Sequence, residues 1–151
     1  MQTRAILERL IGFDTVSAKP NMALMGYVQG LLADAGIDST LIPDATGHKS
    51  NLYATVGPAG VGGVMLSGHT DVVPVEGQAW TVPPFQLTER DGRYYGRGAA
   101  DMKGFVACAI AAMLEAAKRT LQVPLHLALS YDEEIGCMGV RSLIDMLEGA
   151  P

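Results

Sequence analysis

The sequence has little cysteine and lacks the features of a secreted or membrane protein. Only Cys108 and Cys137 occur among 151 residues, and they are not closely spaced, so we expect free thiols and a reducing compartment. Arg4, Glu8 and Arg9 interrupt the apolar residues of the first twelve positions, which argues against a secretory signal there. No apolar run is long enough to span a bilayer. The sequence therefore predicts a cytoplasmic protein without a membrane partner.

Basic charge is also scarce. The chain carries 11 Lys and Arg against 16 Asp and Glu, a net charge of -5, and no basic stripe appears. Because nucleic acids and anionic membranes are bound through clustered cationic side chains, this balance argues against either partner. Hydrophobic residues make up 48% of the chain, which is typical of a globular domain, and the length suits one domain with its own core.

Hydrophobic periodicity predicts helices alternating with strands. Helices are expected where apolar residues recur every three to four positions, at 6–11, 21–35, 105–118 and 140–147. Strands are expected where short runs alternate or are wholly apolar, at 37–42, 51–56, 63–67, 93–95 and 125–131. The proline-containing stretch 73–93 is expected to be a loop. We therefore predict an α/β fold, a three-layer sandwich around a mixed, largely parallel sheet.

Polar residues with metal-binding potential follow the predicted strand that ends at residue 67. His69 can bind a metal through one ring nitrogen while the other donates to a carboxylate, and Asp71 lies two positions on. A histidine in an ordinary turn is the alternative, since His-x-Asp alone is a weak signal.

Carboxylates occur in two further places. Asp101 lies on a glycine-rich loop before a predicted helix, where it can bridge two cations or simply complement the helix dipole. Glu133 and Glu134 follow the last predicted strand, where one can accept a proton and the other bind a metal, or both can belong to a solvated turn. Together with His69, these residues make a set of ligands suited to zinc or a similar divalent ion.

The motifs, taken in order, resemble those of the M20 di-zinc aminoacylase and carboxypeptidase family. The stretches that carry the resemblance are 67–74, 96–104 and 132–137, and those at 13–17, 49–52 and 125–131 resemble its acetylornithine deacetylase branch. The resemblance implies that residues 1–151 are the N-terminal portion of a zinc-peptidase-like catalytic domain. The family's lid and dimerisation domain and its C-terminal catalytic segment have no counterpart in this stretch.

The resemblance also implies residue roles. His69, Asp101 and Glu134 are expected to be metal ligands, with Asp101 bridging two divalent ions, zinc first and cobalt or manganese as alternatives. Glu133 is expected to be the general base, and Asp71 a second catalytic residue that orients His69. The peptide bond after Asp101 is expected to be cis.

The implied reaction is hydrolysis of the N-acyl amide bond of a small-molecule amino acid derivative, by a protein that is a homodimer at full length. N-acetylornithine, an intermediate of arginine biosynthesis, is the favoured substrate. Ala100 replaces the Cys or Val of many acetylornithine deacetylases and matches the succinyl-diaminopimelate desuccinylases, so these and other M20 aminoacylases or carboxypeptidases remain alternatives. A non-catalytic binding module is the other class, and the presence of Asp101 and Glu133 argues against it. Because residues 1–151 supply only two ligands to each ion, we expect this stretch alone to be inactive.

Structural roles are expected for the remaining candidates. His126, inside a predicted strand, is expected to be hydrogen-bonded, Cys108 to pack within a helix, and Cys137 to have no catalytic role. Arg97 and Lys103, on either side of Asp101, are expected to be solvated or ion-paired, and orienting a substrate carboxylate is the alternative for either.

Overall fold

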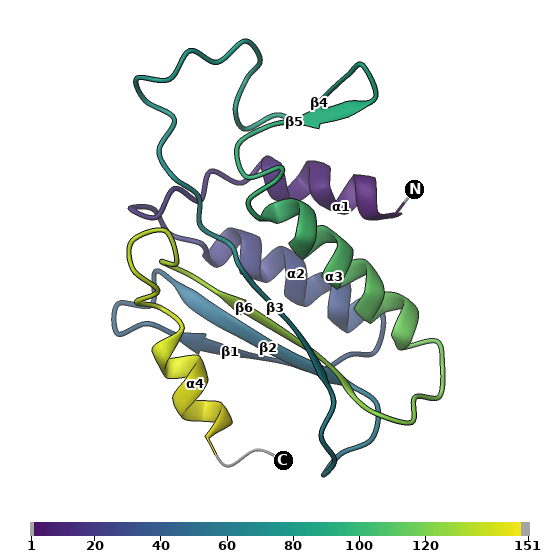
Figure 1. Ribbon diagram of the computed structural model, residues 1–151. Helices are drawn as coiled ribbons and strands as arrows, with labels where there is room; N and C mark the ends of the chain where they lie inside the picture. The colour runs from purple at the N-terminus through teal and green to yellow at the C-terminus, as the bar shows by residue number, and fades with distance from the viewer. Residues whose placement is uncertain (1, 149–151) are drawn as a thin grey trace.

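Helices and strands alternate along the chain (Figure 1). The computed structural model describes residues 2–148, so residues 1 and 149–151 of the predicted unit lie outside the described part. The helices are α1 (Gln2–Ile11), α2 (Met22–Asp34), α3 (Lys103–Ala116) and α4 (Arg141–Leu147). The strands are β1 (Ser39–Pro43), β2 (Ser50–Val56), β3 (Val64–His69), β4 (Thr88–Arg90), β5 (Arg93–Tyr95) and β6 (Leu125–Ser130).

Four strands form the main sheet in the order β1-β2-β6-β3. The predicted mixed sheet is confirmed, but its parallel part is smaller than predicted, because β2 runs antiparallel to both of its neighbours. β3 and β6 form the one parallel pair among the described strands. A short connection makes β1 and β2 a hairpin, whereas β3 reaches β6 only after the crossover through α3, as a parallel pair requires.

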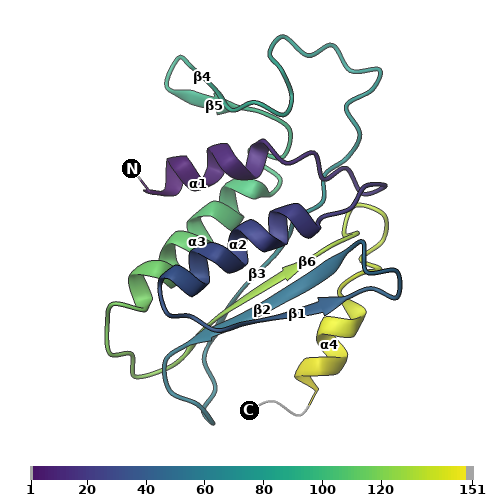
Figure 2. The same cartoon turned by 180° about the vertical axis from the view of Figure 1, so that it is seen from behind.

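Helices cover both faces of this sheet, which confirms the three-layer arrangement. Leu52 and Ala54 of β2 belong to the core shared with α1, α2 and α3. Asn51 points to the opposite face, because neighbouring side chains of a strand alternate, and there its amide donates to the carbonyl of Gly139 just before α4. Figures 1 and 2 accordingly show α4 on the other side of the sheet from the three longer helices.

Apolar side chains from three helices and the two central strands make a single core. Its fully buried members are Leu10, Ile11, Met25, Val28, Leu32, Leu52, Val106, Ala107, Ile110, Met113, Leu127 and Leu129. Burying one such side chain stabilises the fold by about 1.5–3 kcal/mol. The core therefore fixes α3 against β3 and β6, and with it the loops at both ends of these elements.

One predicted loop contains structure. Residues 88–90 form β4, which pairs with β5 around Asp91 and Gly92, both with positive φ. The Asp-Gly pair favours a hairpin turn, so the loop prediction is wrong for residues 88–90 although the stretch contains three prolines. Among the described residues, no helix is both long and apolar enough to cross a membrane.

Candidate metal centre

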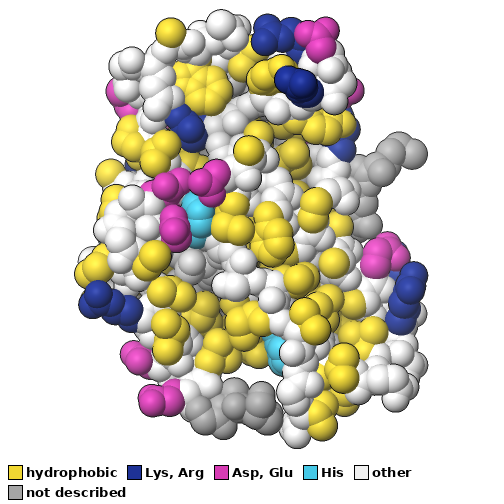
Figure 3. All heavy atoms as spheres, in the orientation of Figure 1, with side chains coloured by type: hydrophobic (Ala, Val, Ile, Leu, Met, Phe, Trp, Pro, Cys, Tyr) yellow, Lys and Arg dark blue, Asp and Glu magenta, His cyan; other side chains and the backbone are white. Residues whose placement is uncertain are grey.

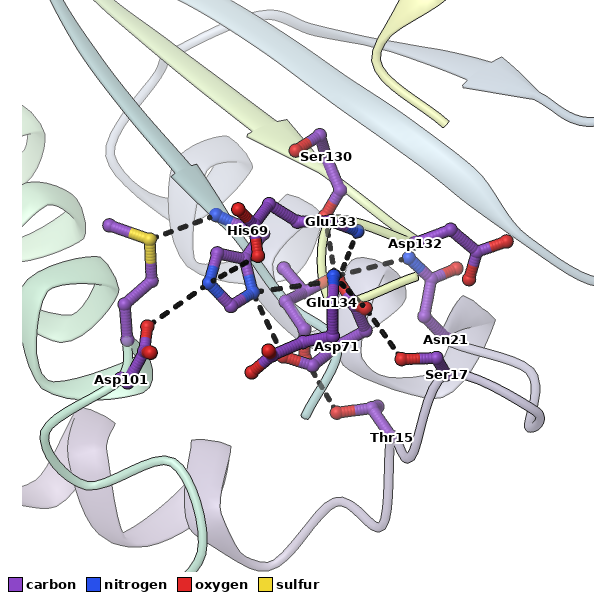
Figure 4. A network of polar contacts seen from close by, with 12 residues as sticks. Thr15, Ser17, Asn21, His69, Asp71, Asp101, Ser130, Asp132, Glu133 and Glu134 are labelled. Carbon is purple, nitrogen blue, oxygen red and sulfur yellow. Dashed lines mark hydrogen bonds and ion pairs between the residues drawn. The ribbon is translucent and has the colours of Figure 1, made fainter. Parts of the chain in front are cut away.

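The ends of two adjacent parallel strands bring the candidate residues together. His69, the last residue of β3, lies beside Ser130, the last residue of β6, and Glu133 and Glu134 follow in the next loop. Asp101 approaches from the loop before α3 (Figure 4). Ligands of open α/β sheets commonly bind at such carboxyl ends of strands.

The ring of His69 is buried and held in a defined orientation. Its Nδ1 lies 3.0 Å from the carbonyl oxygen of Asp71, which can only accept, so Nδ1 carries the proton. In the neutral ring Nε2 then presents its lone pair to the acidic cluster, 3.2 Å from Asp101 Oδ1 and 3.5 Å from Glu133 Oε2. A lone pair that faces carboxylate oxygens is stabilised only by a proton or a cation between them.

The buried carboxylate of Asp71 connects three parts of the site. It accepts hydrogen bonds from Ser17 Oγ at 2.7 Å and from the backbone N–H groups of Glu133 and Glu134 at 3.1 and 3.2 Å. Its nearest oxygen is 3.5 Å from His69 Nδ1, so the backbone carbonyl is the closer partner of the histidine. The hydrogen bonds that it accepts hold the pKa of Asp71 below its usual value, although burial alone would raise it.

The four predicted side chains lie on one side of the molecule. One ligand atom each from His69, Glu133 and Glu134 lies within 4.8 Å of the others. The side chain of Asp101, in contact with His69 Nε2, is 77% exposed. Figure 3 shows acidic side chains gathered around a histidine at the surface. The outer half of the site is therefore open, in contrast to its buried inner half around Asp71.

The electrostatics of this group favour a cation. Burial raises the pKa of Glu134, the charge of His69 opposes this, and the charges of Asp101, Asp71 and Glu133 add to the rise. Burial alone would lower the pKa of His69, but its contacts with Asp71 and the charge of Glu133 raise it to about 9. One imidazole nitrogen and several crowded carboxylates fit the donor preferences of a divalent metal ion.

A small cavity adjoins this group. It measures about 230 Å³ and its lining includes His69, Met102, Glu133 and Val140, so it combines polar and apolar walls. A larger groove of about 520 Å³ lies elsewhere on the sheet, beside Tyr53, and none of the described residues that line it carries a carboxylate. The smaller cavity is therefore the one related to the candidate chemistry.

The backbone around Asp101 has the expected special geometry. The peptide bond between Asp101 and Met102 is cis, as predicted. A Cβ at Gly104 would lie 2.3 Å from the carbonyl oxygen of Ala99, so only glycine lets the first turn of α3 pack against the loop.

Several buried polar residues support the site without having been singled out from the sequence. The side-chain amide of Asn21 donates to the carbonyl oxygen of Ser50 and to Thr70 Oγ1. Lys49 Nζ lies 2.6 Å from Asp132 Oδ1. Ser17, Lys49 and Asn51 lie in the stretches 13–17 and 49–52, whose resemblance to relatives was the available signal. The sequence could not show which segments these polar groups contact.

Three other expectations can be compared with the structure. Lys103 is only 1% exposed, and its Nζ donates to the carbonyl of Phe13 at 2.7 Å, so the expectation of a solvated or ion-paired lysine was wrong. Its hydrocarbon stem packs beside Gly98, where α3 meets the 98–101 loop. Cys108 is exposed on α3 instead of packed. His126 is hydrogen-bonded as predicted, with Nδ1 2.8 Å from the hydroxyls of Tyr53 and Thr55.

Comparisons with known proteins agree with this geometry. Residues 65–151 match peptidase family M20/M25/M40. Over 147 residues the chain is 43% identical to acetylornithine deacetylase of Myxococcus xanthus, covering 94% of this chain and 38% of the relative. Human carnosine dipeptidase 1 superposes with a TM-score of 0.81 at 26% identity, covering 97% of this chain and 35% of that one. The M20 family metallo-carboxypeptidase Sso-CP2 of Sulfolobus solfataricus gives a TM-score of 0.78 at 25% identity, covering 97% and 34%. The chain thus spans 34–38% of the length of these proteins.

Proposed function

The chain belongs to peptidase family M20/M25/M40, and from this membership we propose that the full-length protein hydrolyses N-acetylornithine to ornithine and acetate in a metal-dependent reaction. The convergence of His69, Asp101, Glu133 and Glu134 at the ends of β3 and β6 carries the proposal. The 43% identity to the acetylornithine deacetylase of Myxococcus xanthus supports the choice of substrate. A role in arginine biosynthesis follows if that substrate is right.

His69, Asp101 and Glu134 are the proposed ligands of two divalent ions, with Asp101 shared between them. Zinc suits this set of one nitrogen and several oxygens, and cobalt and manganese are the alternatives. When bound, such ions supply Lewis acidity that lowers the pKa of a water molecule and polarises the amide carbonyl. The raised pKa of Glu134 and the lone pair of His69 Nε2 support these assignments, because both groups gain from a neighbouring positive charge.

Glu133 is the proposed general base. Its side chain is 44% exposed beside the cavity, and its Oε2 lies 3.5 Å from His69 Nε2, so it can reach a water molecule in the site. It accepts a proton from the water that attacks the acyl carbon. As the C–N bond breaks, it returns the proton to the leaving amine, which yields a carboxylate and a free amino acid.

Asp71 is proposed to position the other groups. Its backbone carbonyl fixes the tautomer of His69, and its carboxylate holds the backbone of both Glu133 and Glu134. The base and one ligand are therefore oriented by the same residue.

The deciding experiment compares the full-length protein with its Glu133→Gln variant on N-acetylornithine and N-succinyl-diaminopimelate. The variant keeps the shape of the side chain but cannot accept the proton, so turnover should fall by about 100-fold or more while bound zinc is retained. Glu115→Gln, on the exposed end of α3, is the control and should leave turnover unchanged. Retained turnover in Glu133→Gln would reject the base, and a preference for the succinyl compound would reject the substrate.

A further inference from the structure

We propose that Lys49 and Asn51 are positioning residues, which clamp the segment 131–140 that carries Glu133 and Glu134. This inference rests on the proposed function, since it names what holds the proposed base and one proposed ligand. Segment 131–140 connects the end of β6 to the start of α4. Lys49 and Asn51 are two positions apart, the spacing of side chains on one face of a strand.

Lys49 holds the beginning of the segment. Its Nζ lies 2.6 Å from Asp132 Oδ1, and the two side chains are only 18% and 14% exposed. Figure 4 shows the side chain of Asp132 directed away from His69, so it is not part of the acidic cluster. Lys49 also donates to the carbonyl of Ser17, whose hydroxyl donates to Asp71. The ammonium group of Lys49 therefore links Asp132, which precedes Glu133, to Ser17. Ser17 in turn donates to Asp71, which accepts from the backbone N–H of Glu133.

Asn51 holds the end of the segment. It is fully buried, and its Nδ2 lies 2.8 Å from the carbonyl oxygen of Gly139 and 3.0 Å from Ser142 Oγ. A Cβ added to Gly139 would lie 2.2 Å from the carbonyl oxygen of Tyr131, so the two ends of the segment touch each other. The segment is thus a closed loop whose ends are fastened at the start of β2, one by Lys49 directly before the strand and one by Asn51 within it.

The loop needs such external contacts because its own backbone is strained. Asp132 and Cys137 have φ angles of 57° and 56°, a left-handed conformation that residues with a side chain rarely adopt. Backbone N–H groups of residues 136, 137 and 138 bond to carbonyls of Glu133 and Asp132 inside the loop. Strained conformations persist where surrounding contacts fix them, and the partly buried Lys49–Asp132 pair is such a contact.

The test uses Lys49→Met in the full-length protein, with Lys49→Arg as the conservative variant that restores the charge. Lys118→Met is the matched control, because Lys118 makes a pair of the same 2.6 Å length with Glu115 at an exposed position. Replacing a residue that orients the ligands of a metal site typically lowers activity by about 10- to 100-fold. We expect kcat to fall in that range in Lys49→Met with little change in KM, to recover in Lys49→Arg, and to stay constant in Lys118→Met.

Hydrogen exchange measured by mass spectrometry gives a second readout that does not depend on activity. In Lys49→Met, amide exchange should accelerate in peptides covering 131–140 and stay unchanged in those covering α3. Adding Asp132→Asn to Lys49→Met should cause no further loss, because both changes remove one contact. Asn51→Ala should accelerate exchange at the same peptides. If the unmodified protein fails to cleave N-acyl amino acids, the proposed function is wrong, and the exchange data still decide on the clamp.

Two results would overturn the clamp. One is unchanged kcat together with unchanged exchange at 131–140 in Lys49→Met. The other is a uniform increase of amide exchange over the whole chain with unchanged kcat. This result would show that Lys49 stabilises the fold as a whole and does not position the segment 131–140. If Lys49→Met does not fold, Asp132→Asn replaces it, because that change removes the same ion pair from the other side.

Discussion

Asp71 and Asp101 are two carboxylates of the same site with opposite surroundings. Asp71 is 3% exposed and accepts hydrogen bonds from Ser17 and from the backbone of Glu133 and Glu134. Asp101 is 77% exposed, and its side chain contacts His69. The inner half of the site is thus fixed by the folded chain, whereas the outer half leaves its oxygen atoms free. This difference separates residues that hold the site together from residues available to a ligand.

The largest effect that would sharpen this comparison is expected for Asp71→Ala. Removing the Asp71 carboxylate leaves the buried hydroxyl of Ser17 and two partly buried backbone N–H groups without an acceptor, which should lower the free energy of unfolding by about 3–5 kcal/mol. Urea denaturation of the full-length protein, in the presence of EDTA to remove metal ions, measures this change in the free energy of unfolding. A loss below about 1 kcal/mol would show that water replaces these bonds and that the inner half is not preformed.

Asp101→Asn is the opposite case. Because the side chain is exposed, stability of the chelated protein should change by less than about 0.5 kcal/mol. Affinity for zinc, measured by competition with a chromophoric chelator, should fall by at least about 10- to 100-fold. If the variant and the unmodified protein bind zinc equally tightly, Asp101 is not a ligand. The proposed difference in role between Asp71 and Asp101 is then wrong.

A smaller effect is expected from the titration of His69. The pKa of His69 is raised from 6.5 to about 9, so its protonated form favours the folded state. This contribution is fully present below pH 6.5 and disappears as the pH rises towards 9. In the presence of EDTA, the free energy of unfolding should therefore fall between pH 6.5 and about 9. In His69→Asn this fall should be smaller.

A comparable effect is expected for Lys103, whose pKa shift has the opposite sign. Burial lowers its pKa from 10.5 to about 8, so the unfolded chain binds its proton more tightly. Stability should therefore rise with pH between about 8 and 10.5, relative to Lys103→Met, which carries no titrating group. Parallel pH profiles for both proteins would show that the ammonium is solvated, contrary to its burial in the structure.

Local patterns were enough to predict much of this molecule. The 3.6-residue and two-residue periods placed the four helices and most strands, because each period reports which face of an element is buried. His69, Glu133 and Glu134 could be predicted because they lie at or just after the ends of strands, and the cis bond after Asp101 could be predicted from the resemblance. Their roles as base and ligands stay predictions.

What could not be predicted depends on contacts between distant segments. Ser17 and Asp71 are 54 positions apart, and Asn51 and Gly139 are 88 apart, so no local period connects them. The burial of Lys103 depends in the same way on how α3 packs against the 98–101 loop. The direction of β2 was missed because hydrophobic patterns do not distinguish parallel from antiparallel neighbours.

The pairing of β3 with β6 has a consequence for how the site comes into being. Asp71 and Glu133 are separated by 62 positions, and closing a loop of that length costs entropy on the order of 4 kcal/mol. No metal ion can find its proposed ligands side by side until α3 has packed and β6 has joined β3. Binding of the proposed ions is therefore expected late in folding, and weakening the strand pair, for example at Leu129, should reduce metal affinity without changing any proposed ligand.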